Sequence, residues 1–148
     1  MDDTNMASRR PAATAAISAR TGLDDALLER VVRVFYGTAR HDPLLAPIFA
    51  RITDWESHVE RISAFWSSVA LQSGRYHGQP MEAHLPLGLK PEHFARWLEL
   101  WEETAQAECP PEGAALLVNR ARRIADSLQH AVAFHAGALP PVRRRGTA

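Results

Sequence analysis

The residues best suited to chemistry in this chain are its histidines, and they are spread widely. They are His41, His58, His77, His84, His93, His130 and His135. A structural zinc site needs about four nitrogen or sulfur ligands at short spacings, and a zinc-protease helix needs two histidines one turn apart with a glutamate between them. Neither pattern occurs here, and Cys109 is the single cysteine. A multi-histidine or multi-cysteine metal site is therefore not predicted.

His84 differs from the other histidines in the segment that surrounds it, which reads QPMEAHLPL. Pro86 limits a helix bearing His84 to about two turns, and Gly78, Pro80 and Gly88 flank the segment. A plain helical hairpin does not need a separate short helix at this place. We therefore expect something bound by His84 to hold the segment in place. The alternative is an ordinary histidine with one hydrogen bond.

The elements that must position His84 are predicted to be helices. Apolar residues recur at helical spacing in four long stretches, without short alternating runs between turn signals, so the domain is predicted to be all-α. The first long helix is expected from after TGLDD to about Arg40, and HDPLLAPIF allows only a short turn of helix after it. The expected core face of the first helix is Leu27, Val31, Val34 and Phe35, with Leu28 and Val32 beside them.

Three more long helices complete the expected domain. The second begins at TDWE, where Thr53 and Glu56 have capping-box spacing, and continues to Gly74. The third opens at KPEHF, where Pro91 suits a first helical position, and CPPEG ends it. The fourth spans roughly residues 112–134.

Length and composition bound the remaining organisation. A chain of 148 residues predicts one domain, at residues 21–136, between disordered tails at 1–20 and 137–148. The balanced formal charge gives no support to a nucleic-acid or membrane partner. No apolar run approaches the roughly 18 residues of a membrane span, and the N-terminus lacks the apolar stretch of a secretion signal, so we expect a cytoplasmic protein. We expect a monomer or a weak dimer.

Three polar aromatic residues are expected to face one interior. His58 lies one helical turn before Ile62, so the two share a face, which also carries Phe65. Tyr36 belongs to the first helix and Trp97 to the apolar stripe of the third. Each has an apolar body and a donor that needs a partner when buried. Opposite a histidine on a short helix, they indicate a site for a planar apolar cofactor. The alternative is that they only pack, as in a helical interaction or regulatory module without a cofactor.

Five motifs follow one another in a fixed order. They are FY at Phe35 and Tyr36, DPLLAPIF from Asp42, DWESHVERISAFWSSV from Asp54, GRYHGQPMEAHLPL from Gly74 and HFARWLELW from His93. This order resembles the third group of the truncated haemoglobins, in the globin superfamily, over about residues 23–134. The resemblance implies a two-over-two helical sandwich enclosing haem b, iron protoporphyrin IX. The paired glycines of other truncated groups are missing, which agrees with the third group.

The resemblance also implies roles for individual residues. His84 falls on the proximal position, the fifth ligand of the haem iron. Tyr36 and Trp97 fall on the distal hydrogen-bonding positions, His58 on the distal-histidine position and Ile62 on an apolar distal position. The expected haem contacts are Phe35, Tyr36, His58, Ile62, Phe65, His84 and Trp97.

The implied function is binding of O2 and of other small ligands, namely NO, CO and cyanide. If the Tyr36 and Trp97 donors together contribute about 3 kcal/mol, ligand loss slows roughly a hundredfold, which favours redox chemistry or sensing over bulk transport. Turnover of NO to nitrate, or peroxide reduction, would need an external reductase, because the chain has no dinucleotide glycine motif. In a sensor, His58 would bind the iron until a gas displaced it. Arg61 and Arg75 are candidates for the haem propionates by proximity alone.

Overall fold

The computed structural model describes residues 2–78, 84 and 87–135, with side chains from residue 10 to residue 134. Its helices are α1 (Asp2–Thr21), α2 (Asp25–Ala39), α3 (Ala46–Phe49), α4 (Trp55–Leu71), α6 (Pro91–Glu108) and α7 (Pro111–His135). Because these residues contain no strand, the prediction of an all-α domain is confirmed. Across the same residues, no helix is both long and apolar enough to cross a membrane.

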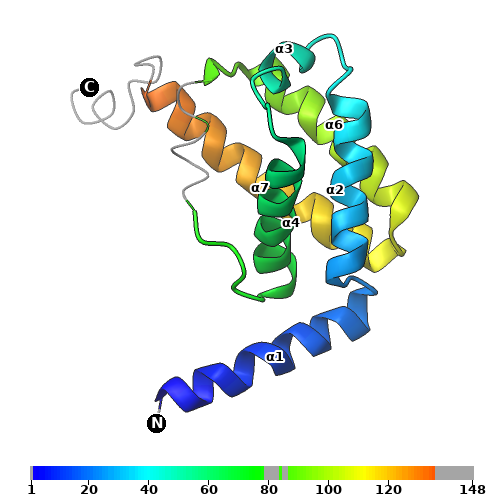
Figure 1. Ribbon diagram of the computed structural model, residues 1–148, viewed down its shortest axis with the longest axis vertical. Helices are drawn as coiled ribbons and strands as arrows, with labels where there is room; N and C mark the ends of the chain where they lie inside the picture. The colour runs from blue at the N-terminus through cyan, green and yellow to red at the C-terminus, as the bar shows by residue number, and fades with distance from the viewer. Residues whose placement is uncertain (1, 79–83, 85–86, 136–148) are drawn as a thin grey trace, which may run out of the picture.

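The helices form two layers (Figure 1). α2 and α4 run side by side in opposite directions, and α6 and α7 form a second antiparallel pair behind them. α2 contacts α4 and α6, while α7 contacts α6 and α4. This is the two-over-two arrangement that the sequence motifs imply.

The start of α4 differs by one residue from the predicted one. Asp54, and not Thr53, is the N-cap, because its carboxylate accepts a hydrogen bond from the Ser57 backbone N–H at 3.1 Å. The predicted capping box of Thr53 and Glu56 is wrong. The Glu56 carboxylate instead accepts two hydrogen bonds from the Arg33 guanidinium of α2, at 3.0 Å each. The acidic residue therefore links two helices and does not cap one.

The end of α4 also comes earlier than the expected Gly74. The last helical residue is Leu71, and Gln72 takes a left-handed conformation with φ 58°. The Gln72 N–H donates to the Ser68 carbonyl at 3.1 Å, and the Ser73 N–H donates to the Ser67 carbonyl at 3.4 Å. These bonds satisfy carbonyls that the helix end leaves without partners. The chain thus turns back before it reaches the glycine.

The first twenty residues differ from the expected disordered tail, because residues 2–21 form helix α1. Ile17 and Thr21 are buried, and α1 contacts α4 and α7. The Thr14 hydroxyl donates to the Leu71 carbonyl at the end of α4, at 2.7 Å. Sequence patterning missed this helix because its alanines favour helix without forming an apolar stripe. The predicted tail at 137–148 lies outside the described residues.

The buried face of α2 is rotated from the predicted one. Val34 is 37% exposed and Leu27 is half-buried, whereas the fully buried positions follow the helical repeat from Leu28. The buried residues are Leu28, Val31, Val32, Phe35, Tyr36 and Ala39. Tyr36 therefore belongs to the interior face of α2.

The centre of the core is a stack of three indole rings. The Trp101 ring lies nearly parallel to Trp66, with centroids 4.5 Å apart, and to Trp97, with centroids 6.0 Å apart. Phe35 meets Trp101 and Trp97 edge-on at 5.3 and 6.1 Å. The buried Trp101 Nε1 donates to the Leu117 carbonyl of α7 at 3.3 Å. These contacts join all four long helices of the two layers.

The corner between α2 and α3 is held by a buried carboxylate. Asp42 accepts hydrogen bonds from the backbone N–H groups of Leu44 and Leu45, and from Arg96 of α6 at 2.7 Å. Burial by itself raises the pKa of Asp42, but the Arg96 hydrogen bond and charge and the two N–H donors outweigh it and hold the pKa below its usual value. The charged corner therefore places α3 against the end of α2.

Two glycine-to-alanine substitutions test this packing. At Gly37, in α2, an added methyl meets nothing within 4 Å, so the higher helix propensity of alanine should raise the free energy of unfolding by about 0.5 to 1 kcal/mol. At Gly113, in α7, the methyl would lie 2.8 Å from the Thr21 carbonyl oxygen and 2.9 Å from Leu23 Cδ2. Gly113→Ala should therefore lower the free energy of unfolding by about 1 to 3 kcal/mol. Chemical denaturation measures both, and a stabilising Gly113→Ala would contradict the packing of α7 against the end of α1.

Candidate functional site

Two of the predicted site residues, Tyr36 and His58, meet between α2 and α4. Their ring centroids are 5.0 Å apart. The Trp55 ring lies 5.4 Å from Tyr36 and 5.7 Å from His58, and Phe49 of α3 lies 5.3 Å from Tyr36. We call these four residues the Tyr36 cluster. The Arg40 guanidinium covers the Trp55 ring at 4.5 Å, which closes one side of the cluster by a cation–π contact.

Two polar groups of this cluster, on His58 and Tyr36, have no hydrogen-bond partner among the described residues. His58 Nε2 is buried, and in the described part of the chain nothing is hydrogen-bonded to it. The Tyr36 hydroxyl likewise forms no hydrogen bond with any described residue, although Tyr36 is only 8% exposed. Buried polar groups in proteins are nearly always paired, because an unpaired one costs about 1 to 3 kcal/mol. The cluster therefore offers two polar groups to a bound molecule.

The same burial keeps both groups neutral. It raises the pKa of the Tyr36 hydroxyl well above its usual value, although the positive charge of Arg61 acts in the opposite direction. Burial lowers the pKa of His58 to about 4, and the charges of Arg61 and His84 act in the same direction. At neutral pH, Tyr36 is thus a hydrogen-bond donor and His58 an uncharged imidazole.

His84 lies within electrostatic range of His58, since its charge lowers the pKa of His58. The His84 ring is half-buried and its backbone is helical. Residues 79–83 and 85–86, which make up most of the predicted short helix, lie outside the described residues. The structure thus brings the two predicted histidines within electrostatic range, and the role of His84 as a ligand stays a prediction.

The other predicted contact residues lie around the core rather than in the Tyr36 cluster. Trp97 is half-buried and touches Phe35, which in turn meets Tyr36 at 5.1 Å. Ile62 is half-buried and packs against the main core. Phe65 packs edge-on against Trp66 at 5.6 Å and Tyr76 at 5.2 Å. Phe35 therefore connects the cluster to Trp97, whereas Phe65 lies nearer the end of α4.

Arg61 and Arg75, the two candidates for the haem propionates, differ in whether they already have a carboxylate partner. Arg75 forms an ion pair with Asp25 at the start of α2, at 3.0 Å, so its guanidinium already has a carboxylate. Arg61 is exposed and forms no ion pair with any described residue, and its charge acts on Tyr36 and His58. Arg61 is therefore the better placed of the two.

Sequence reasoning missed Trp55 and Phe49 as members of the cluster. The signal for Trp55 was present, because it lies three residues before His58 and therefore shares its helical face. Phe49 ends the motif DPLLAPIF, but no spacing links it to Tyr36. That contact depends on how the Asp42 corner turns the chain.

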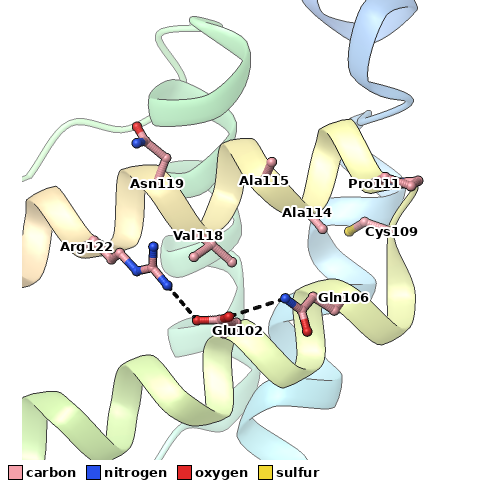
Figure 2. A pocket seen from close by; sticks show the side chains of 9 residues that line it. All are labelled: Glu102, Gln106, Cys109, Pro111, Ala114, Ala115, Val118, Asn119 and Arg122. Carbon is pink, nitrogen blue, oxygen red and sulfur yellow. Dashed lines mark hydrogen bonds and ion pairs between the residues drawn. The ribbon is translucent and has the colours of Figure 1, made fainter.

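A separate groove of about 550 Å³ lies between α6 and α7 (Figure 2). Its lining residues are Glu102, Gln106, Cys109, Pro111, Ala114, Ala115, Val118, Asn119 and Arg122. None of the predicted site residues is among them.

Burial, with the charge of Glu108, raises the pKa of the Cys109 thiol to about 11, so the thiol stays protonated and unreactive. Among the described residues, no group of three or more histidine, cysteine, aspartate or glutamate side chains could hold a metal ion.

Comparison with known proteins agrees with this geometry. No protein-family model matches the chain. The chain is 31% identical over 116 residues to the group 3 truncated hemoglobin ctb of Campylobacter jejuni, covering 74% of this chain and 91% of that protein. The crystal structure of a group III truncated hemoglobin from Campylobacter jejuni matches with a TM-score of 0.69 and 32% identity, over 74% of this chain and 91% of that one. The fold is thus that of a truncated globin. The chain belongs to the group III truncated haemoglobins.

The neutral His58 predicts a pH dependence of stability. Its pKa is about 4 in the folded chain against 6.5 for a free histidine, so between these values the unfolded chain binds more protons. The stability contributed by neutral His58 is therefore complete above pH 6.5 and is lost as the pH falls toward 4. After solvent screening of a half-buried ring is allowed for, the loss should be about 2 kcal/mol.

Denaturation of the haem-free protein at several pH values between 7 and 4 measures how the free energy of unfolding falls with pH. His58→Gln should remove this pH dependence, whereas His41→Gln, at an exposed position, should leave it unchanged. An unchanged pH dependence in His58→Gln would assign the acid sensitivity to other groups.

Proposed function

We propose that this protein binds haem b through His84 and holds O2, NO or CO against Tyr36 and Trp97, for redox chemistry or sensing. The observation that carries the proposal is the buried His58 Nε2, which has no partner among the described residues and lies beside Tyr36 within electrostatic range of His84. When bound, haem supplies an iron with one axial position for a protein imidazole and one for an exchangeable ligand. Membership of the truncated haemoglobin family supports the presence of haem.

The residues present fit this cofactor. Imidazoles come from two different elements, α4 and the segment at His84, so that a planar group can lie between them. Phe35 and the Tyr36 cluster offer ring surfaces to its apolar faces. Arg61 supplies an unpaired exposed cation, within the described residues, near the same imidazole, where an acidic cofactor edge could be neutralised. The haem-free interaction module, by contrast, gives no reason for the unpaired imidazole nitrogen.

Tyr36 and Trp97 act on the ligand as fixed donors. The raised pKa of Tyr36 keeps the phenol protonated and uncharged at neutral pH. Its O–H can therefore donate to a ligand that carries partial negative charge, without repulsion from a phenolate. The Trp97 indole can only donate. Both lie in a largely buried, aromatic environment, where such hydrogen bonds are stronger than in water. Slow ligand loss favours chemistry on the ligand, or sensing of it, over transport.

Turnover of NO to nitrate, or peroxide reduction, would be an extension of this proposal. Either reaction would require electrons from an external reductase. The 148-residue chain has no glycine motif for a dinucleotide cofactor that could supply them.

A second candidate function is gas sensing by displacement of His58. The neutral imidazole has a free lone pair at neutral pH, and its Nε2 has no partner in the part of the chain that the structure describes. The His58 imidazole could therefore bind the haem iron until a gas displaced it. A six-coordinate low-spin spectrum without added ligand, abolished in His58→Gln, would favour this function over open-site ligand binding.

Substitution of His84 tests the cofactor assignment. Wild-type protein expressed with haem supply should show a Soret band that shifts on dithionite reduction and again on CO addition. In His84→Ala the band should weaken or lose its axial-imidazole character, because no other imidazole is expected at the proximal position. His77→Ala, an exposed histidine in the preceding loop, is the matched control and should behave as wild type. Absence of haem from the wild type would refute the proposed function.

Substitution of the distal donors tests the ligand-holding role. Tyr36→Phe removes one donor and almost no volume, while Trp97→Phe removes one donor together with part of the ring stacked on Trp101. Each should speed O2 dissociation about tenfold, and together about a hundredfold. Stopped-flow kinetics on the ferrous protein measure these rates. Tyr76→Phe, at the tyrosine outside the cluster, is the control. Equal rates in Tyr36→Phe and wild type would remove Tyr36 from the ligand site.

A further inference from the structure

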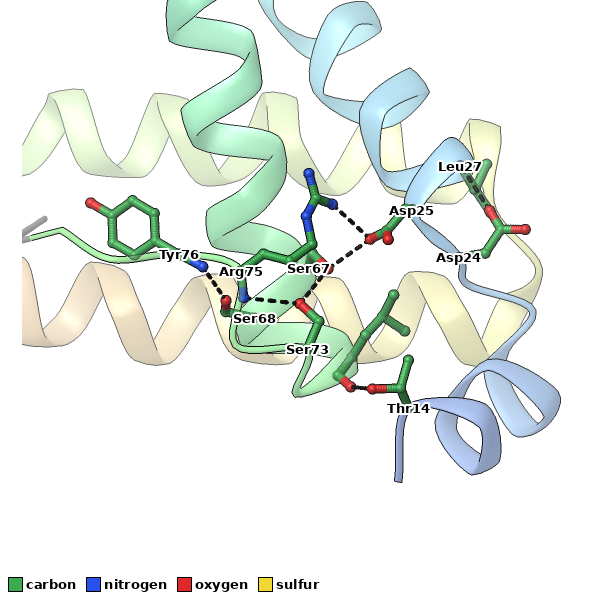
Figure 3. A network of polar contacts seen from close by, with 10 residues as sticks. Thr14, Asp24, Asp25, Leu27, Ser67, Ser68, Ser73, Arg75 and Tyr76 are labelled. Atoms are coloured by element: carbon green, nitrogen blue, oxygen red, sulfur yellow. Dashed lines mark hydrogen bonds and ion pairs between the residues drawn. The ribbon is translucent and has the colours of Figure 1, made fainter. Parts of the chain in front are cut away.

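A network of short polar side chains holds the segment that follows α4 (Figure 3). The Ser67 hydroxyl, which is fully buried, donates to the Asp25 carboxylate and shares a hydrogen bond with the Ser73 hydroxyl, each at 2.6 Å. The Ser68 hydroxyl accepts from the Tyr76 backbone N–H at 2.8 Å. We call Asp25, Ser67, Ser68, Ser73 and Arg75 the serine strap.

The strap binds backbone as well as side chains. The Arg75 N–H donates to the Ser73 hydroxyl at 3.4 Å, while the Arg75 guanidinium reaches the Asp25 carboxylate at 3.0 Å. After the turn at Gln72 the chain therefore runs back along α4 and is fastened at residues 73, 75 and 76. Tyr76 is also held by its ring, which packs edge-on against Phe65 of α4 at 5.2 Å.

Helix α1 supports the same turn from outside. Thr14 donates to the Leu71 carbonyl at 2.7 Å. The Arg10 guanidinium packs directly against Gly74, whose φ of 73° and lack of a side chain permit the approach. The strap and these two contacts of α1 thus join α1, α2 and α4 just before the segment that leads to His84.

We infer that the serine strap positions His84, with Ser68 as the positioning residue because its hydroxyl holds the Tyr76 N–H, the last fastened group before His84 among the described residues; this rests on the proposed haem function. His84 lies eight residues beyond Tyr76 and thirteen beyond Leu71 (84 − 76 and 84 − 71). Fastening at Tyr76 therefore fixes the chain closer in sequence to His84 than the end of α4 does. It also fixes the place and the direction in which the chain leaves Tyr76.

The polar composition of the strap supports a positioning role. In a helix that only packed, alanine could replace a fully buried serine. The Ser67 hydroxyl instead forms hydrogen bonds with two residues outside its own helical turn, Asp25 and Ser73. The Arg33–Glu56 ion pair already links α2 with α4 near the other end of α4. Joining these helices therefore does not require the strap.

The test compares Ser68→Ala with Ser68→Thr in the haem-loaded full-length protein. The alanine removes the acceptor for the Tyr76 N–H, and the threonine keeps it at a half-buried position. Arg33→Gln, which breaks the other α2–α4 ion pair, is the control. The readouts are the iron–histidine stretching band of the ferrous protein by resonance Raman, the rate of haem transfer to an excess of a scavenging apoglobin, and hydrogen exchange of the Tyr76 amide.

Ser68→Ala should shift or broaden the iron–histidine band, speed haem loss two- to tenfold and increase exchange at Tyr76. Ser68→Thr should restore all three, and Arg33→Gln should change none of them. Faster exchange at Tyr76 with an unchanged band and unchanged haem loss would overturn the inference while leaving the haem function intact. If the wild type bound no haem, the proposed function would fail first and the inference with it. Should Ser68→Ala not fold, Asp25→Asn, at an exposed carboxylate, carries the same test.

Discussion

The stacking of Trp101 between Trp66 and Trp97 is the interaction on which the other parts of the structure depend. It joins α4 to α6, and the Trp101 N–H joins α6 to α7, so that one buried side chain holds both layers together. Large flat rings bury much apolar area with few rotatable bonds, and truncation of such a core residue costs about 3 to 5 kcal/mol. Phe35 packs edge-on against this stack and also against its neighbour Tyr36, so it connects the stack to the Tyr36 cluster.

This dense aromatic core explains the properties of the polar residues beside it. Tyr36 and His58 are kept neutral by the apolar rings around them, and burial is the largest cause of both pKa changes. A neutral imidazole with an unpaired nitrogen costs stability in the free protein, and that cost is offset when a ligand satisfies it. Buried polar atoms without a partner, such as His58 Nε2, are found most often at functional sites.

Much of the fold could be predicted from single stretches of sequence, because helix periodicity and end signals are local. Pro91 opens α6, two prolines confine α3 to one turn, and α2 begins at Asp25, one residue before the predicted start. The errors arose where a local signal had two uses. Glu56 fits a capping box but pairs with Arg33, and α1 has no apolar stripe yet docks against α4 and α7. Partners distant in the sequence decided both cases.

The sequence by itself determined the helical class, the order of the elements and the motifs of a truncated globin, because these depend on residue types and spacings along one chain. Only the tertiary structure decided that Phe49 lies against Tyr36, since Phe49 reaches it through a corner fixed by Asp42 and Arg96. Tertiary structure also decided the neutral state of His58 and the fastening of residues 73–76 to Asp25 and α1. Burial, unpaired polar atoms and long-range hydrogen bonds are properties of packed helices, which no local pattern encodes.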